Sequence, residues 1–267
     1  MRASGLGYPL AAALIVMVAC GDAAIPSAAV TVGVVTLFAR STDGNYVARP
    51  EGLFALASGP PTVDSRSTVD TCQVADYVPQ STSMSVVQVD AGDSLVFAVG
   101  AATTLLRPIK RFGITVYAAQ PADVGFVPGM EVTFTIPGAP GGFPETTISS
   151  LTPAALTSLT PISSRPPLDQ PLDVAWGPAG DDSSRFEMLL IFARQGTTEF
   201  NEQVVCDWRD DGTGVIRAQL LGGWSLSEAQ RIEVSRYRTQ RREMGDTTLL
   251  LLATFDTVPA VAAPQTP

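Results

Sequence analysis

The sequence predicts an all-β protein made of two antiparallel β-sandwich domains that follow an N-terminal export signal. The first observation is a series of short segments in which apolar and polar residues alternate, which is the period of a half-buried strand. The second is that clusters of Gly, Pro, Asp and Ser separate these segments, at a spacing typical of β-sandwiches. The third is a short apolar run that precedes all of them.

The first twenty residues resemble a bacterial lipoprotein signal. Arg2 provides a charged start, residues 10–18 are apolar, and Cys20 follows Ala19 directly. As a helix the apolar run rises about 14 Å, which is too short for a bilayer core of about 30 Å and disfavours a transmembrane anchor. The alternative is an ordinary secretory peptide cut near Ala19, which leaves Cys20 as a free thiol.

The lipoprotein interpretation places the protein in the bacterial cell envelope. It predicts a signal peptide over residues 1–19, an acylated Cys20 that anchors the chain to the membrane, and a tether over residues 20–29. In lipoprotein families an acidic residue after the cysteine signals retention at the inner membrane, whereas this chain has Gly21. We therefore expect the outer membrane, with its periplasmic or surface face left open.

Composition narrows the function classes. The formal net charge of −9 argues against nucleic acid as a partner, because phosphate contacts require Lys and Arg. The chain has no His, which removes Ser-His-Asp and Cys-His catalysis and the commonest zinc ligand. Phosphate-binding, dinucleotide-binding and nucleophile-elbow motifs are also absent from the sequence. We expect no cofactor and no enzymatic role.

Three cysteines are present, and two remain once Cys20 is assigned to the anchor. Exported proteins reside where disulfides persist, so Cys72 and Cys206 are predicted to form one. The alternative is two separate buried thiols, which are common in apolar cores.

The N-terminal domain is predicted over residues 30–160. Val-rich alternation predicts a strand from Val30 to Phe38, and Asp43-Gly44 predicts the hairpin turn after it. Further strands are predicted at 46–47, 53–56, 83–89, 94–99, 112–118 and 131–136, with 83–89 and 94–99 paired as a hairpin. A Pro-, Ser- and Thr-rich linker ends the domain, with the boundary near residue 160.

The C-terminal domain is predicted over residues 161–258. Its strands are predicted at 172–176, 186–193, 202–208, 215–221, 232–237 and 247–255. Ser225 and Glu228 match a capping box, which predicts one helical turn over 226–230. The Pro- and Ala-rich residues 259–267 are predicted to be disordered.

Two segments of this domain carry a family resemblance. Residues 171–178, with Trp176 before a turn, resemble an early core strand of fibronectin type III and other immunoglobulin-like domains. Residues 206–212, which run from Cys206 to Gly212, resemble a segment of uncharacterised β-rich lipoproteins of high-GC Gram-negative bacteria. The resemblance implies an immunoglobulin-like sandwich and an envelope location, and it implies no catalytic residues.

The acidic residues at 207–211 are the candidate metal ligands. Asp207, Asp210 and Asp211 precede Gly212, and carboxylate oxygens before a glycine suit calcium. Arg209 occupies one of the positions at which a calcium loop has a ligand, so the favoured interpretation is a hairpin turn in which Asp-Gly supplies left-handed backbone. The pair at residues 181–182 has the same two interpretations.

Aromatic and basic residues are the candidate ligand-binding groups. Trp208 and Trp224 flank turns and are candidates for stacking on sugar rings, whereas Trp176 is in phase with a strand and is expected in the core. Arg236 and Arg238 share one strand face in the chain's basic cluster, where they are candidates for anionic ligands. The alternative is a solvated face balanced by Glu228, Glu233 and Glu243.

These observations predict an envelope-anchored lipoprotein with a non-catalytic binding or scaffolding role. The expected partners are the membrane, through the N-terminal lipid, and an envelope protein or glycan. One alternative is a carbohydrate-binding or glycan-active protein that uses paired carboxylates and aromatic rings. Another is an assembly component that accepts a partner strand at a free sheet edge.

Overall fold

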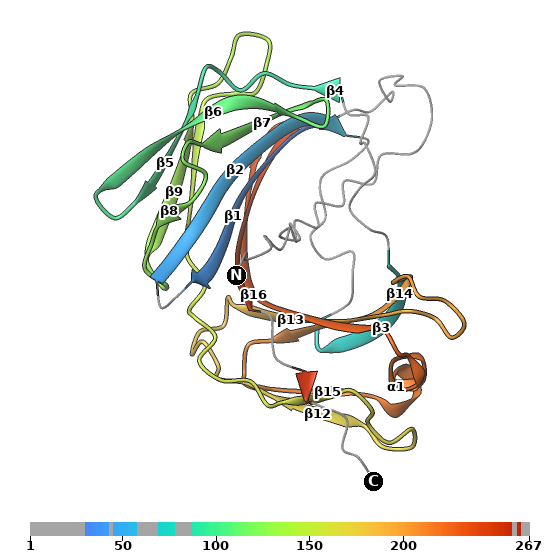
Figure 1. Cartoon of the computed structure of the whole chain (residues 1–267). Coiled ribbons are helices and arrows are strands. Elements are labelled where there is room, and N and C mark those ends of the chain that lie inside the picture. Colours follow the sequence, from blue (N-terminus) through green and yellow to red (C-terminus); the bar gives the residue numbers. More distant parts are fainter. Residues whose placement is uncertain (1–29, 43–44, 58–68, 78–86, 258–260, 263–267) are drawn as a thin grey trace, which may run out of the picture.

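The computed structural model describes residues 30–42, 45–57, 69–77, 87–257 and 261–262, and it confirms the all-β prediction (Figure 1). The predicted signal peptide, Cys20 and the tether lie outside the described residues. Of the predicted disordered tail, residues 261–262 are described and form a short strand. No helix among the described residues is long and apolar enough to cross a bilayer.

Most strands belong to one large sheet. Its order is β10 (Thr146–Leu151), β9 (Glu131–Ile136), β5 (Leu95–Val99), β6 (Ala102–Arg111), β7 (Ile114–Ala119), β2 (Asn45–Ala57), β1 (Val30–Thr42), β17 (Thr247–Thr257), β16 (Gln230–Met244), β13 (Arg185–Phe192), β14 (Glu202–Arg209) and β3 (Thr71–Asp76). The short strands β4 (Val87–Gln88) and β8 (Val124–Gly125) also pair with β2.

Two small pairs complete the fold. β12 (Leu172–Ala175) pairs with β15 (Thr213–Ile216), and β11 (Ile162–Ser163) pairs with β18 (Val261–Ala262). A 3₁₀ turn (Ala218–Leu220) and helix α1 (Gly222–Leu226) follow β15. Pairings are antiparallel except β1 with β17 and β11 with β18, which are parallel.

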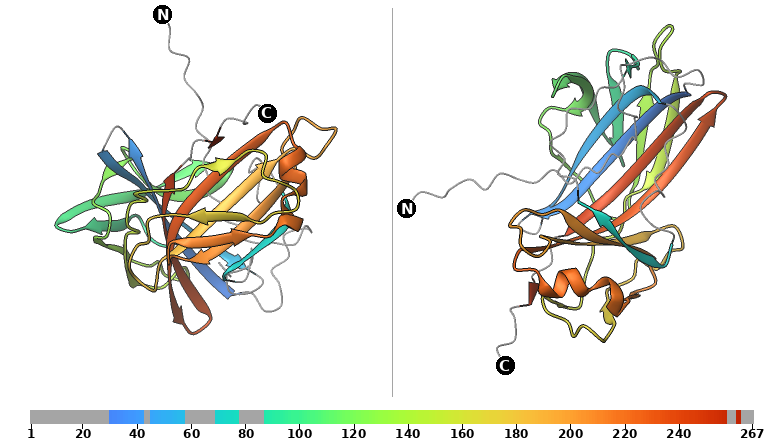
Figure 2. Two further views of the ribbon diagram at one scale, coloured as in Figure 1. Left: turned by 90° about the horizontal axis from the view of Figure 1, so that it is seen from below. Right: turned by 90° about the vertical axis from the view of Figure 1, so that its right-hand side faces the viewer.

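The large sheet bends into two lobes, each with its own core. In the upper lobe of Figure 1, strands β5 to β9 curl over β1, β2 and β17 around a core that contains Phe54, Phe97 and Phe134. In the lower lobe, β13, β14 and β3 face β12 and β15 around Phe186 and Trp224. Figure 2 shows the long strands β1, β2, β16 and β17 running side by side.

The two lobes do not correspond to the halves of the chain before and after the boundary predicted near residue 160, because each lobe contains a strand from the other half. β3 pairs with β14 in the lower lobe, and β17 pairs along β1 in the upper lobe. β16 serves both, because its first half pairs with β13 and its second half pairs with β17. The division into domains at 30–160 and 161–258 stays a prediction.

Several predicted elements are confirmed and others are wrong. In β9, Val132, Phe134 and Ile136 are buried on one face, as their alternation predicts. The predicted hairpin of 83–89 with 94–99 is wrong: β4 pairs with β2, whereas β5 pairs with β6 and β9. The strand expected at 53–56 is part of one continuous strand, β2, that starts at residue 45.

Two local features differ from expectation. Helix α1 ends at Leu226, so Ser225 lies inside the helix rather than at its N-terminus, and the capping-box prediction is wrong. The strand predicted over 112–118 begins at Ile114, because Phe112 and Gly113 form the turn from β6.

Candidate functional site

The two acidic turns that the sequence marks meet at one end of the lower lobe. β13 and β14 are antiparallel neighbours, and Arg185 lies opposite Arg209. The turn before β13 and the turn after β14 are therefore side by side, although the residues are distant in sequence. Together they line a cleft of 490 Å³. Its lining residues are Pro178, Gly180, Asp181, Asp182, Ser184, Arg185, Arg209, Asp210 and Asp211.

Arg236 and Asp210 form a buried ion pair beneath this cleft. The Nε of Arg236 is 2.5 Å from Oδ2 of Asp210, and Nη2 donates to Oδ1 at 3.0 Å. The indole Nε1 of Trp176 donates to the same Oδ1 at 2.7 Å. Arg236 also donates to the carbonyl oxygens of Ala154 and Ala155, at 3.2 and 2.9 Å, and to that of Gly177. A buried charge is tolerated only with such partners, so this pair has a structural role that joins four segments.

Arg238 and Asp181 make a second pair next to the first. Arg238 donates through Nη2 to Oδ2 of Asp181 and through Nε to Oγ of Ser184 at 3.0 Å. Asp181 also accepts hydrogen bonds from Ser183 and Ser184. Partial burial acts to raise the pKa of Asp181, but these hydrogen bonds and the Arg238 charge outweigh it and lower the pKa below 3.8.

Arg236 and Arg238 are buried, so the prediction that they lie on a solvated strand face balanced by glutamates is wrong. Glu233 and Glu243 pair with Arg231 and Arg241, at 2.9 and 2.6 Å. The pairs of Arg236 and Arg238 are with aspartates instead. Both arginines follow Ile232 and Val234 in steps of two along β16, so they point into the lobe's interior. This period-two spacing with Ile232 and Val234 could have predicted their burial from the sequence. Their positive charge instead favoured the prediction of an exposed face.

Asp207, Asp210 and Asp211 have different partners. Asp207 is a neighbour of Tyr237, where burial, followed by the charges of Asp207 and Glu187, raises the Tyr237 pKa above its usual range. Asp211 is exposed, and its Oδ1 accepts a hydrogen bond from the Thr213 amide at 3.1 Å. In the part of the chain that the structure describes, no three His, Cys, Asp or Glu side chains are grouped to hold a metal ion.

Residues 210–212 were interpreted as a hairpin turn with left-handed backbone at the glycine. The backbone conformation is as expected, but the turn does not connect two paired strands. Gly212 has a φ of +97°, the left-handed conformation expected after Asp. The turn does not close a hairpin, because β14 pairs in the large sheet while β15 pairs with β12. It carries the chain from one layer of the lobe to the other.

All three tryptophans are buried, so none offers a ring at the surface. Trp176 stacks on Phe186, with ring centroids 3.8 Å apart and ring planes at 5° to each other. The ring centroids of Trp176 and Trp208 are 5.6 Å apart. Trp224 is fully buried, and its Nε1 donates to the Ser163 carbonyl at 3.2 Å. The core prediction for Trp176 is confirmed. Burial of Trp208 and Trp224 removes the platform on which a sugar ring would stack.

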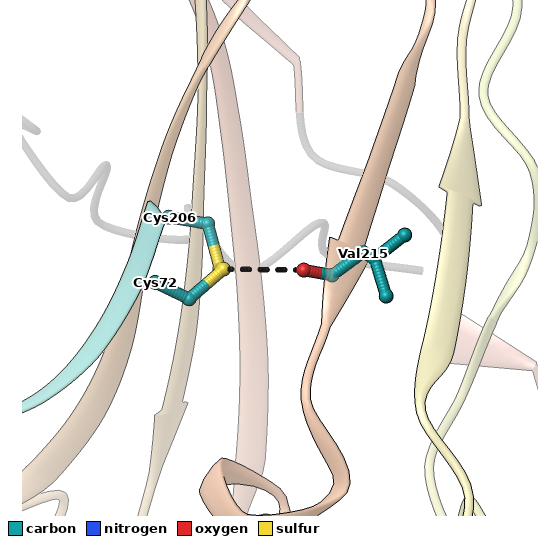
Figure 3. Close-up of a disulfide and its surroundings, with 3 residues drawn as sticks. All are labelled: Cys72, Cys206 and Val215. Carbon is teal, nitrogen blue, oxygen red and sulfur yellow. Dashed lines mark hydrogen bonds between the residues drawn. A yellow bond between two sulfur atoms is a disulfide. The ribbon is translucent and has the colours of Figure 1, made fainter. Parts of the chain in front are cut away.

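Cys72 and Cys206 form the predicted disulfide, which joins β3 to β14 (Figure 3). The two residues are separated by 134 positions, and their Cα atoms are 4.1 Å apart. Figure 3 shows the bond turned toward β15, where Sγ of Cys72 lies 3.9 Å from the Val215 carbonyl oxygen. The bond therefore fastens β3 to the sheet from inside the lobe.

The charges that remain on the cleft are of both signs. The Asp210 and Asp181 carboxylates are engaged by Arg236 and Arg238, which leaves Asp182, Asp211, Arg185 and Arg209. Arg209 forms an ion pair with Asp70, with 3.2 Å between its Nε and the Asp70 Oδ2. This mixture favours neither a cation nor an anion, and it fits a polar surface contact better than a small charged ligand. No protein-family model matches this chain, and no curated protein matches its sequence.

Proposed function

We propose that this protein is exported and anchored in the bacterial cell envelope through an acylated Cys20, with a non-catalytic binding or scaffolding role. The expected location is the outer membrane, and the expected partner is an envelope protein or glycan. The immunoglobulin-like character of residues 171–256 belongs to the same proposal. The packing of Trp176 between the layers of the lower lobe supports it.

The observation that carries the proposal is the Cys72–Cys206 disulfide. Disulfides persist in oxidising compartments and are rare in the cytosol. Most of the side chains of β3 are exposed, so its contact with the core is small and the covalent link is important for holding it. A fold that depends on such a link suits an exported protein, and the signal-like residues 1–20 supply the means of export.

The internal contacts of the polar candidates favour binding or scaffolding over glycan chemistry. A carboxylate-dependent mechanism needs two acids facing a substrate. Asp210 and Asp181 instead hold buried arginines, and Trp208 and Trp224 pack in the core. These groups stabilise the lobe that they occupy.

Metabolic labelling with a radioactive fatty acid tests the anchor. We expect label in the wild-type protein and none in Cys20→Ala. The double variant Cys72→Ser/Cys206→Ser is the matched control, because it removes both other thiols and should keep the label. Label that persists in Cys20→Ala, or a wild-type chain cut near Ala19 without label, would overturn the anchor. Thiol alkylation of the wild-type protein from intact envelopes should find Cys72 and Cys206 unreactive.

A further inference from the structure

The turn between β6 and β7 departs from the usual residue preference of a tight hairpin. Arg111 pairs with Ile114, which leaves a two-residue loop of Phe112 and Gly113 with φ values of +50° and +84°. Two positive φ values are typical of a type I′ turn, whose first position favours Asn, Asp or Gly. The only other non-glycine residue with positive φ in the described chain is Asp70, a residue type that tolerates it.

Nothing within the fold compensates for this conformation. Phe112 is 93% exposed, more than any other large apolar residue that the structure describes. Its ring is therefore not held in place by core packing, although a bulky residue with positive φ is strained. A residue that is both strained and exposed indicates a role outside the folding of the chain.

The hairpin is also a basic region on an acidic protein. Residues 94–122 contain Arg107, Lys110 and Arg111 and no acidic residue, in a chain with a formal charge of −9. Arg111 pairs with Glu51 at 2.6 Å, whereas Arg107 and Lys110 are exposed. In Figure 1 these strands lie in the upper lobe, on the opposite side of the molecule from β12 and β15.

We propose that the β6–β7 hairpin docks on an anionic lipid surface, through Lys110 and Phe112 at its tip and Arg107 further along β6. Aromatic rings are enriched at the membrane interface, where they sit at headgroup level. Exposed basic side chains are attracted to anionic lipid, while the acidic remainder of the protein is repelled. Charge therefore selects this face for contact, and the ring inserts between the headgroups.

The proposed contact at the tip is separate from the acyl anchor, so lipid binding by the tip is tested with a protein that has no anchor. A form that begins at residue 21 contains every described residue and has no Cys20. We expect it to float with vesicles that contain phosphatidylglycerol, to float much less with phosphatidylcholine alone, and to dissociate as salt is raised. Lys110→Gln should lower the partition coefficient about fivefold.

Phe112→Gly separates binding from folding. Glycine adopts positive φ without strain, so the variant should be at least as stable to heat as the wild type. Loss of the ring should still lower vesicle binding about tenfold. Leu226→Ala is the matched control, since Leu226 is 58% exposed on α1 in the other lobe, and it should bind like the wild type.

Three results would overturn the docking proposal: full binding by Phe112→Gly, equal binding to neutral and anionic vesicles, or no binding to either. None of them bears on the anchor, which is read separately by fatty-acid labelling of Cys20.

Discussion

Arg236 and Asp210 neutralise each other in the interior of the lower lobe, where their side chains are 1% and 0% exposed. The arginine comes from β16 and the aspartate from the turn between β14 and β15, so the pair joins the large sheet to the opposite layer. Through Trp176 the same carboxylate also reaches the residue that follows β12.

Asp210→Asn should be strongly destabilising. It keeps the shape of the side chain but leaves the Arg236 guanidinium buried without a counter-charge, which costs about 3 to 5 kcal/mol. Urea unfolding followed by circular dichroism measures the change. Asp211→Asn is the control, because this neighbouring side chain is exposed and should change stability by less than about 0.5 kcal/mol. A loss of less than about 1 kcal/mol for Asp210→Asn would contradict a structural role for the pair.

The depressed pKa of Asp181 predicts a defined pH dependence. A carboxyl group whose folded pKa is lowered adds stability above its unfolded pKa, near 3.8, and that stability is lost as pH falls through the folded value. Asp181→Asn should thus be less stable than the wild type near neutral pH, and the two should converge in acid. Unfolding free energies measured from neutral to acid pH check this, with Asp182→Asn as a control in the same turn. Parallel curves at all pH values would refute it.

Gly214 is predicted to be intolerant of a side chain because of Trp208. A Cβ at Gly214 would lie 2.6 Å from a ring carbon of Trp208, which is fixed in the core. Gly214→Ala should therefore destabilise the protein by about 1 to 3 kcal/mol. Gly222→Ala is the matched control, since a Cβ there meets nothing within 4 Å. Equal thermal midpoints for the two variants would show that the lobe repacks freely around Trp208.

Reduction of the disulfide should release β3 before the rest of the fold. In the chain-entropy model a link across 134 residues stabilises by about 4 to 5 kcal/mol. Hydrogen exchange with and without reductant should show protection lost first at Gln73 and Ala75, whose partners on β14 are Val205 and Gln203. Unchanged exchange in β3 after complete reduction would show that strand pairing alone holds it.

Local patterns predicted the elements whose side chains alternate regularly. The burial of Val132, Phe134 and Ile136 in β9 follows directly from period-two spacing. β6 went unpredicted because Arg107, Pro108 and Lys110 interrupt its apolar residues, of which only Leu106 is buried. A strand with little buried surface leaves little trace in a hydrophobicity pattern.

Pairing partners and buried charges were harder to predict for a common physical reason. Whether Val87 pairs with Leu56, or Thr31 with Thr247, depends on residues far away in sequence. The role of Asp210 likewise depends on Arg236, which belongs to a different strand. The Cys72–Cys206 bond was the exception, because a chain with three cysteines has few possible pairings.

The position of β1 has a mechanical consequence for a protein held by its N-terminus. The described fold begins at Val30, and β1 lies between β2 and β17, paired along its length with both. If the chain is anchored through Cys20 as proposed, a pull directed along β1 would be transmitted to this strand. It loads both ladders in shear, so many hydrogen bonds must break together instead of opening one after another from an end. A chain anchored in the proposed way would therefore resist traction at its point of attachment.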